Sequence, residues 1–221
     1  MQANAPATSG PPAVATPLCA SLHAVSKLFG SFAALRQVSV DLEPGRCYVL
    51  IGENGAGKST LLRILAGLLR PSFGTVKLFG NLEPHDARDR VGYMSHAPML
   101  YDELTAEENL RYFAKLYPGR DCLTPAEALR QVGLDPELTR PFGQYSQGMR
   151  QRTSLARVLL PAPELLLLDE PFSNMDVESV SQMVALLAKF RQGTAPSSSP
   201  PTSASTPPPS PIGSSPSAPA A

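Results

Sequence analysis

Hydrophobic and polar residues alternate over residues 22–28 and 38–42, which is typical of strands that bury one face. We expect these two segments to form antiparallel strands. Residues 47–51 are apolar at every position, as in a parallel strand that is covered on both faces. Residues 75–79 predict another short strand, and the run 164–168 predicts the last strand of the core.

The middle of the chain changes to helical spacing. Thr105 and Glu108 match a capping box, and the apolar residues after them recur every three or four positions. Thr124 begins a second helix, and Ser146 precedes a third. A last helix is predicted over residues 177–191. This order predicts an α/β fold with a mixed sheet, antiparallel at its N-terminal strands, and a helical subdomain.

Composition divides the chain into three parts. Residues 1–17 are rich in Ala and Pro, and residues 193–221 are rich in Pro and Ser and contain no charged residue. Such segments bury too little apolar surface to offset the entropy lost on ordering, so we expect both to be disordered. The folded domain is expected over residues 18–192, with its helical subdomain at about 96–160.

The charge balance, the cysteine content and the length of the apolar runs limit the partners and the chemistry that we expect. The 19 Lys and Arg residues balance the 19 Asp and Glu residues, so we expect no nucleic-acid partner. The three cysteines share no metal-ligand spacing and are expected to be reduced thiols. No apolar run approaches the ~18 residues of a membrane span, so membrane association would require another chain.

A glycine-rich loop directly follows the apolar run 47–51. It comprises Gly52, Glu53, Asn54, Gly55, Ala56, Gly57, Lys58, Ser59 and Thr60, and an apolar helix follows it. The pattern G-x-x-x-x-G-K-[ST] between a strand and a helix is that of a phosphate-binding loop. Its backbone N–H groups and the helix N-terminus bind nucleotide phosphates. We expect ATP there, with Lys58 on the β- and γ-phosphates and Ser59 on Mg²⁺.

Two carboxylates stand at the end of the last predicted strand. Asp169 and Glu170 directly follow the apolar residues 165–168 of the predicted strand 164–168. Ligand sites in open α/β sheets lie at the carboxyl ends of strands. We expect Asp169 to hold Mg²⁺ through a water and Glu170 to orient and polarise the attacking water. An ordinary acidic turn is the alternative if the pair is considered alone.

Between these two motifs, residues 145–152 resemble the signature motif of ABC ATPases, usually written L-S-G-G-Q. Ser146 and Gly148 match it, whereas the other three positions differ. Asp176 falls in a segment that resembles the D-loop of that family. Phe29 stands where the family usually has an aromatic residue that stacks on adenine, and a core phenylalanine is the alternative for it.

The resemblance covers about residues 20–190 and implies that two cassettes face each other head to tail. ATP is then held between the phosphate loop of one and the signature helix of the other, so Ser146 and Gly148 are expected to act on the γ-phosphate bound by the partner. It also implies an ATPase that energises a separate membrane permease at the cytoplasmic face of the membrane. Two other interpretations stay open: a nucleotide-binding regulatory subunit without turnover, and a soluble ABC ATPase.

Two departures from the family pattern are visible, and the first is in the Q-loop. The family carries Gln after a short strand, and His96 takes its place here. The imidazole is expected to contact a magnesium-bound water, and a surface histidine on a loop is the alternative. Residues 92–105 resemble the haem exporter ATPases of cytochrome c maturation. The apolar residues Met99, Leu100 and Tyr101 suit a contact with the permease.

The second departure concerns the switch histidine that the family places after the D-loop. The histidines here are His23, His85 and His96, so none follows Asp176. We expect the C-terminal part of the domain to be missing, with a sheet edge left uncovered and hydrolysis impaired. A frameshift or truncation near Gly193 would account for the change in composition. A divergent cassette with a linker tail is the alternative.

Overall fold

The computed structural model describes residues 18–191, so the expectations for residues 1–17 and 193–221 lie outside the described part of the chain. Its first sheet has the order β2-β1-β3 and is antiparallel throughout. These strands are β1 (Ala20–Phe29), β2 (Phe32–Leu42) and β3 (Phe73–Leu78). The antiparallel strands predicted from alternation are therefore confirmed.

The second sheet is a parallel pair, β4 (Val91–Met94) and β5 (Leu165–Leu168). Tyr93 lies opposite Leu167 in its ladder, and the last residues of the two strands are also opposite each other. The loops that follow the two strands therefore leave from the same edge of the sheet. Within the described residues, β5 has β4 as its neighbour and a second edge without a paired strand.

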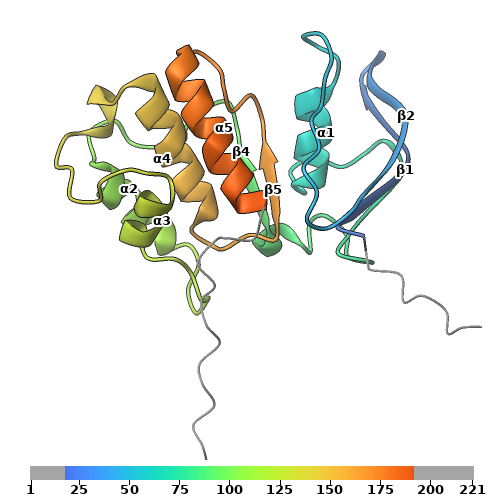
Figure 1. Cartoon of the computed structure of the whole chain (residues 1–221). Helices are drawn as coiled ribbons and strands as arrows, with labels where there is room; N and C mark the ends of the chain where they lie inside the picture. Colours follow the sequence, from blue (N-terminus) through green and yellow to red (C-terminus); the bar gives the residue numbers. More distant parts are fainter. Residues whose placement is uncertain (1–17, 192–221) are drawn as a thin grey trace, which may run out of the picture.

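The described residues also contain five α-helices. They are α1 (Lys58–Leu65), α2 (Ala106–Ala114), α3 (Pro125–Gln131), α4 (Gln147–Leu159) and α5 (Val177–Arg191), with short 3₁₀ turns at Arg88–Arg90 and Phe142–Gln144. The predicted capping box is formed at the start of α2, and α3, which begins after Thr124 as expected, has a capping box as well. Figure 1 shows α4 and α5 on one side of β5 and α1 on the other. None of the helices within residues 18–191 has the length and hydropathy needed to cross a bilayer.

The apolar side chains form two clusters, and β5 lies between them. Leu167 packs with the cluster made by α1 and the antiparallel sheet, whereas Leu166 and Leu168 pack against the cluster made by β4 and the helices α2 to α5. A strand that is covered on both faces needs apolar residues at every position, because successive side chains point to opposite faces. This accounts for the unbroken leucine run of β5.

The expectation of a buried parallel strand over residues 47–51 is wrong. The segment has no strand conformation, and its side chains are exposed, with Ile51 at 92%. Both sheets form without this segment, and no described strand pairs with it. An apolar run predicts only that a segment favours burial. A strand also needs backbone hydrogen bonds to a neighbour, and residues 47–51 form none with the unpaired edge of β5.

Candidate functional site

The phosphate loop runs from Gly52 into α1, which begins at Lys58. Gly55 and Gly57 take left-handed conformations, with φ of 82° and 86°, so glycine fits the tight curve of the loop. Gly57 is the N-cap of α1 and has no side chain to cap it, which leaves the first N–H groups of the helix available to an anion. The Lys58 ammonium donates to the carbonyls of Gly52 (2.8 Å) and Glu53 (2.7 Å) and so lies over the loop.

The loop lies tightly against β2. A Cβ atom at Gly57 would collide with the carbonyl of Ala34 and would lie 2.8 Å from Leu35 Cδ2. Only glycine fits both the left-handed backbone and this close approach. The antiparallel sheet therefore fixes the position of the phosphate loop, although the segment directly before the loop is unpaired.

The Asp169 carboxylate joins the two halves of the site. It is only 5% exposed, and its Oδ1 accepts a hydrogen bond of 2.8 Å from the Ser59 hydroxyl on α1. Its Oδ2 accepts a bond of 3.1 Å from the Tyr93 hydroxyl on β4. Burial, first of all, raises the pKa of Tyr93, and the Arg63 guanidinium opposes this effect. Tyr93 therefore keeps its proton at neutral pH and acts as the donor.

Glu170 is held in an unusual backbone conformation beside Asp169. Its φ of 54° is left-handed, a conformation that costs a non-glycine residue of order 1–3 kcal/mol. The Ser173 hydroxyl lies 2.8 Å from the Glu170 carbonyl oxygen and 3.1 Å from its carboxylate oxygen Oε2. His96 Nδ1 lies 3.5 Å from the same Oε2, because the loop after β4 runs beside the loop after β5. Both side chains are largely exposed, so the Glu170 carboxylate faces solvent.

The signature residues belong to a different part of the molecule. The Ser146 hydroxyl caps α4 by accepting from the Met149 N–H at 3.3 Å. Gly148 lies against α5, where a Cβ atom would meet the Ser179 hydroxyl. Asp176 accepts from both the N–H and the hydroxyl of Ser179, each at 2.8 Å, and these bonds lower the pKa of Asp176. Ser146 caps α4 and Gly148 lies within it, and Figure 1 places α4 on the opposite side of β5 from α1, the helix that follows the phosphate loop.

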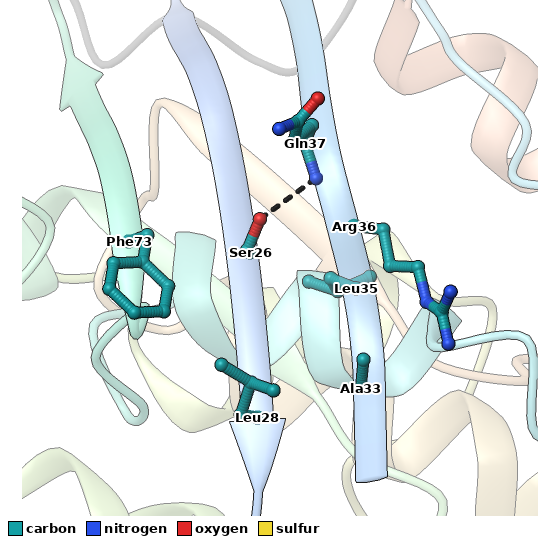
Figure 2. Close-up of a pocket in the computed structure, with 7 residues that line it drawn as sticks. All are labelled: Ser26, Leu28, Ala33, Leu35, Arg36, Gln37 and Phe73. Carbon is teal, nitrogen blue, oxygen red and sulfur yellow. Dashed lines mark hydrogen bonds between the residues drawn. The ribbon is translucent and has the colours of Figure 1, made fainter. Parts of the chain in front are cut away.

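Phe29 lies at the end of β1, half exposed, with the Lys27 ammonium 5.2 Å from its ring centre. It is opposite Phe32 in the β1–β2 hairpin. A hollow of about 430 Å³ lies nearby on the same sheet, and Phe29 is not among its lining residues. It is lined by Ser26, Leu28, Ala33, Leu35, Arg36, Gln37 and Phe73 (Figure 2). No sequence pattern indicates this hollow, whose lining comes from three strands and depends on how they pair.

Of the residues predicted from sequence, five gather in one place: Lys58, Ser59, His96, Asp169 and Glu170. The oxygen atoms of this set suit Mg²⁺, a hard cation that prefers oxygen ligands. The Ser59 hydroxyl and a buried carboxylate oxygen of Asp169 lie 2.8 Å apart. Within residues 18–191 no three His, Cys, Asp or Glu side chains gather around one point. One hydroxyl and one carboxylate leave the other positions around Mg²⁺ to nucleotide phosphates and waters, which is how proteins usually bind this ion.

Comparison with known proteins agrees with this arrangement. Residues 35–173 match the sequence profile of the family described as ABC transporter. That range is more than half of the chain, and it contains the phosphate loop, the signature segment and the acidic pair. The chain belongs to the ABC transporter family.

Two curated ABC transporter proteins illustrate the relationship. The chain is 36% identical over 169 residues to the bacitracin transport ATP-binding protein BcrA of Enterococcus faecalis, covering 75% of this chain and 55% of the relative. It is 37% identical over 170 residues to the zinc import ATP-binding protein ZnuC of Pseudomonas fluorescens, covering 77% of this chain and 62% of the relative. The chain thus spans little more than half the length of the curated relatives it matches.

A solved ABC cassette has the same fold. The dimeric cassette MJ0796, in a post-hydrolysis state bound to ADP and Pi, superimposes with a TM-score of 0.67 and 26% identity. The match covers 79% of this chain and 83% of that chain. The expected ABC-type P-loop fold is confirmed. The narrower resemblance to haem exporters is not shown by these relatives, one of which is named for import.

Proposed function

We propose that this chain is the ATP-binding subunit of a membrane transporter and hydrolyses Mg-ATP to energise transport. The observation that carries the proposal is the hydrogen bond of 2.8 Å between Ser59 and Asp169. It joins the helix that follows the phosphate loop to the strand that ends in two carboxylates. A P-loop helix and an acidic strand end placed side by side can hold a nucleotide phosphate, a divalent cation and an attacking water together.

Each residue of the site has a role in this proposal. Lys58 and the N–H groups of the loop bind the β- and γ-phosphates, which requires the Lys58 ammonium to leave the carbonyls it now bonds. Ser59 and Asp169 hold Mg²⁺, which when bound neutralises charge on the phosphates. Glu170 orients and polarises the water that attacks the γ-phosphate. His96, 3.5 Å from the Glu170 carboxylate, contacts a water on the metal.

We assign the binding surface for the adenine base of ATP to the β1–β2 hairpin. Phe29 is half exposed there, so its ring is accessible for stacking on adenine. The hollow of Figure 2 lies close to the phosphate loop, since Leu35 lines it and also faces Gly57. These positions allow the nucleotide to lie along the hairpin with its phosphates in the loop.

A second cassette completes the site. The helix α4, which Ser146 caps and which contains Gly148, lies on the opposite side of β5 from α1, so both residues are available to a partner (Figure 1). A head-to-tail homodimer would bring them to the γ-phosphate bound by the other chain, with Asp176 at the junction. The dimeric state of MJ0796 supports this arrangement.

A permease is the third component. We assign the surface of this chain that contacts the permease to the loop before α2. Met99 and Tyr101 are exposed, and Tyr101 packs edge-on against the exposed Tyr112. An apolar aromatic surface on a polar domain suits a protein partner. Binding there would place the chain at the cytoplasmic face of the membrane. The resemblance of residues 92–105 to haem exporters gives the finer proposal for the cargo.

The test is Mg²⁺-dependent phosphate release from ATP by the purified chain beside its Glu170→Gln variant. Loss of a positioned general base lowers turnover about 10²- to 10⁴-fold, so the variant should bind ATP and release almost no phosphate. Glu103→Gln, an exposed glutamate outside the site, serves as the matched control and should retain turnover. Turnover that survives Glu170→Gln would show that the base is assigned wrongly.

A second candidate function, ATP binding without turnover, is favoured by the unpaired segment 47–51. This segment leads directly into the phosphate loop and is exposed, so the loop is supported on one side only. A regulatory subunit of this kind would bind ATP in the same assay, and neither the unaltered chain nor the variant would release phosphate. The same experiment therefore separates the two functions.

A further inference from the structure

Tyr93 contacts the acidic pair from a neighbouring strand. It lies opposite Leu167 in the β4–β5 ladder, and Asp169 follows Leu167 by two residues. Side chains two residues apart on a strand share a face, so Tyr93, Leu167 and Asp169 are on the same side of the sheet. A tyrosine is long enough to reach along that face, and its hydroxyl lies 3.1 Å from Asp169 Oδ2.

The two oxygens of the Asp169 carboxylate have different partners. Ser59, which bonds Oδ1, is itself a proposed ligand of the magnesium ion. Tyr93, which bonds Oδ2, lies on β4 and takes no part in binding phosphate or metal. Among the described residues, Tyr93 is thus the donor that can keep the carboxylate oriented whether or not the metal is bound. Burial strengthens this effect, because the carboxylate is 5% exposed and has little water to replace a lost bond.

We propose that Tyr93 is a positioning residue, which fixes the orientation of the Asp169 carboxylate for the Mg²⁺ that accompanies the nucleotide. The proposal rests on the proposed function. Mutation of a residue that orients a metal ligand typically lowers the metal affinity about 10- to 100-fold. A merely structural role would instead affect folding, or nucleotide binding with and without metal equally, since the Tyr93 ring also packs against the cluster around α1.

The experiment uses the full chain, its Tyr93→Phe variant and a non-hydrolysable ATP analogue. The affinity for the analogue is measured in EDTA and during a titration with Mg²⁺. Phenylalanine keeps the ring and removes the hydroxyl alone. We expect the affinity of the variant for the analogue in EDTA to be unchanged. Mg²⁺ increases that affinity, and the Mg²⁺ concentration that gives half of the increase should rise about tenfold.

Tyr48→Phe is the matched control. The Tyr48 hydroxyl also has one hydrogen bond, which it accepts from the Glu43 N–H at 2.8 Å, and it lies outside the acidic pair. Its Mg²⁺ requirement should equal that of the unaltered chain. Because a misfolded variant would lose affinity in EDTA as well, the comparison of the two conditions separates positioning from folding.

Two results with the variant would overturn the inference. One is an unchanged Mg²⁺ requirement, and the other is an equal loss of affinity with and without Mg²⁺. Failure of the unaltered chain to bind the analogue in either condition is a distinct result. It would overturn the proposed function and the inference with it.

Discussion

Residues 47–51 and residues 165–168 are two unbroken apolar runs, each followed by a loop of the candidate site. The second forms β5, which is paired with β4 and covered on both faces. The first is exposed and unpaired. The comparison shows that hydrophobicity sets the tendency to be buried, whereas pairing with another backbone decides whether a strand forms.

The two loops that follow nevertheless meet. The phosphate loop is fixed by its contact with β2 and by the Ser59–Asp169 bond, and not by a strand in front of it. The acidic pair is fixed by the strand itself, with Tyr93 beside it. The acidic pair is therefore held by the strand that leads into it, whereas the phosphate loop is held by contacts with β2 and with Asp169.

The largest expected effect is on the free energy of unfolding, and it distinguishes the buried apolar run from the exposed one. Leu167 is 4% exposed and packs with the cluster around α1, so Leu167→Ala should lower the free energy of unfolding by about 2–4 kcal/mol. Ile51→Ala removes a side chain that already faces solvent and should change it by less than about 0.5 kcal/mol. Urea unfolding of both variants measures the difference. Equal losses would show that residue 51 is buried in solution.

A smaller effect is expected from the ion pairs near the two runs. Arg90 forms two hydrogen bonds to Glu164, of 2.5 and 2.6 Å, at the start of the β4–β5 pair. Since both side chains are partly exposed, Glu164→Gln should cost about 0.5–1 kcal/mol at neutral pH. Glu43→Gln is the control, because it breaks the more exposed Arg46–Glu43 pair before the first run and should have no measurable effect.

The pH dependence of the Arg90–Glu164 pair has a definite sign. The hydrogen bonds from Arg90 lower the pKa of Glu164 in the folded chain. The stabilisation is therefore complete above the pKa that Glu164 has in the unfolded chain, and it is lost as the pH falls through the folded pKa. The difference between the unaltered chain and Glu164→Gln should vanish in acid. A difference that stays constant with pH would contradict this assignment.

The smallest effect on stability is expected for a charge placed within the exposed run. Val49→Lys should leave the free energy of unfolding unchanged within about 0.5 kcal/mol, because the side chain is exposed. It should lower self-association, since it interrupts an unpaired apolar segment. Light scattering at increasing concentration measures this, with Asn81→Lys as a control that adds the same charge without removing apolar surface. An unchanged scattering would show that the run takes no part in association.

Most of the fold could be predicted from the sequence, because local signals decide it. The capping residues Thr105 and Thr124 and the N-cap Ser146 mark the starts of α2, α3 and α4 where the structure has them. Alternation identified β1 and β2. The segment 47–51 could not be predicted in the same way, because its conformation depends on which other strands are next to it.

The candidate site could be predicted in part. The spacing of the phosphate loop identified Lys58 and Ser59, and the position at a strand end identified Asp169 and Glu170, which the structure brings together. Tyr93 was missed, because its contact with Asp169 arises only from the register of β4 on β5. The roles given to Phe29, Ser146 and Asp176 stay predictions, since they depend on a nucleotide and a partner chain.

The first residue of the exposed run is a cysteine, and this has a chemical consequence. Cys47 is exposed, whereas Cys19 is half-buried and burial raises the pKa of its thiol. Thiol reagents act on accessible thiolates, so alkylation should occur first at Cys47. A polypeptide that covers residues 47–51 would slow this reaction, and the rate of labelling would report how much of the run is occupied.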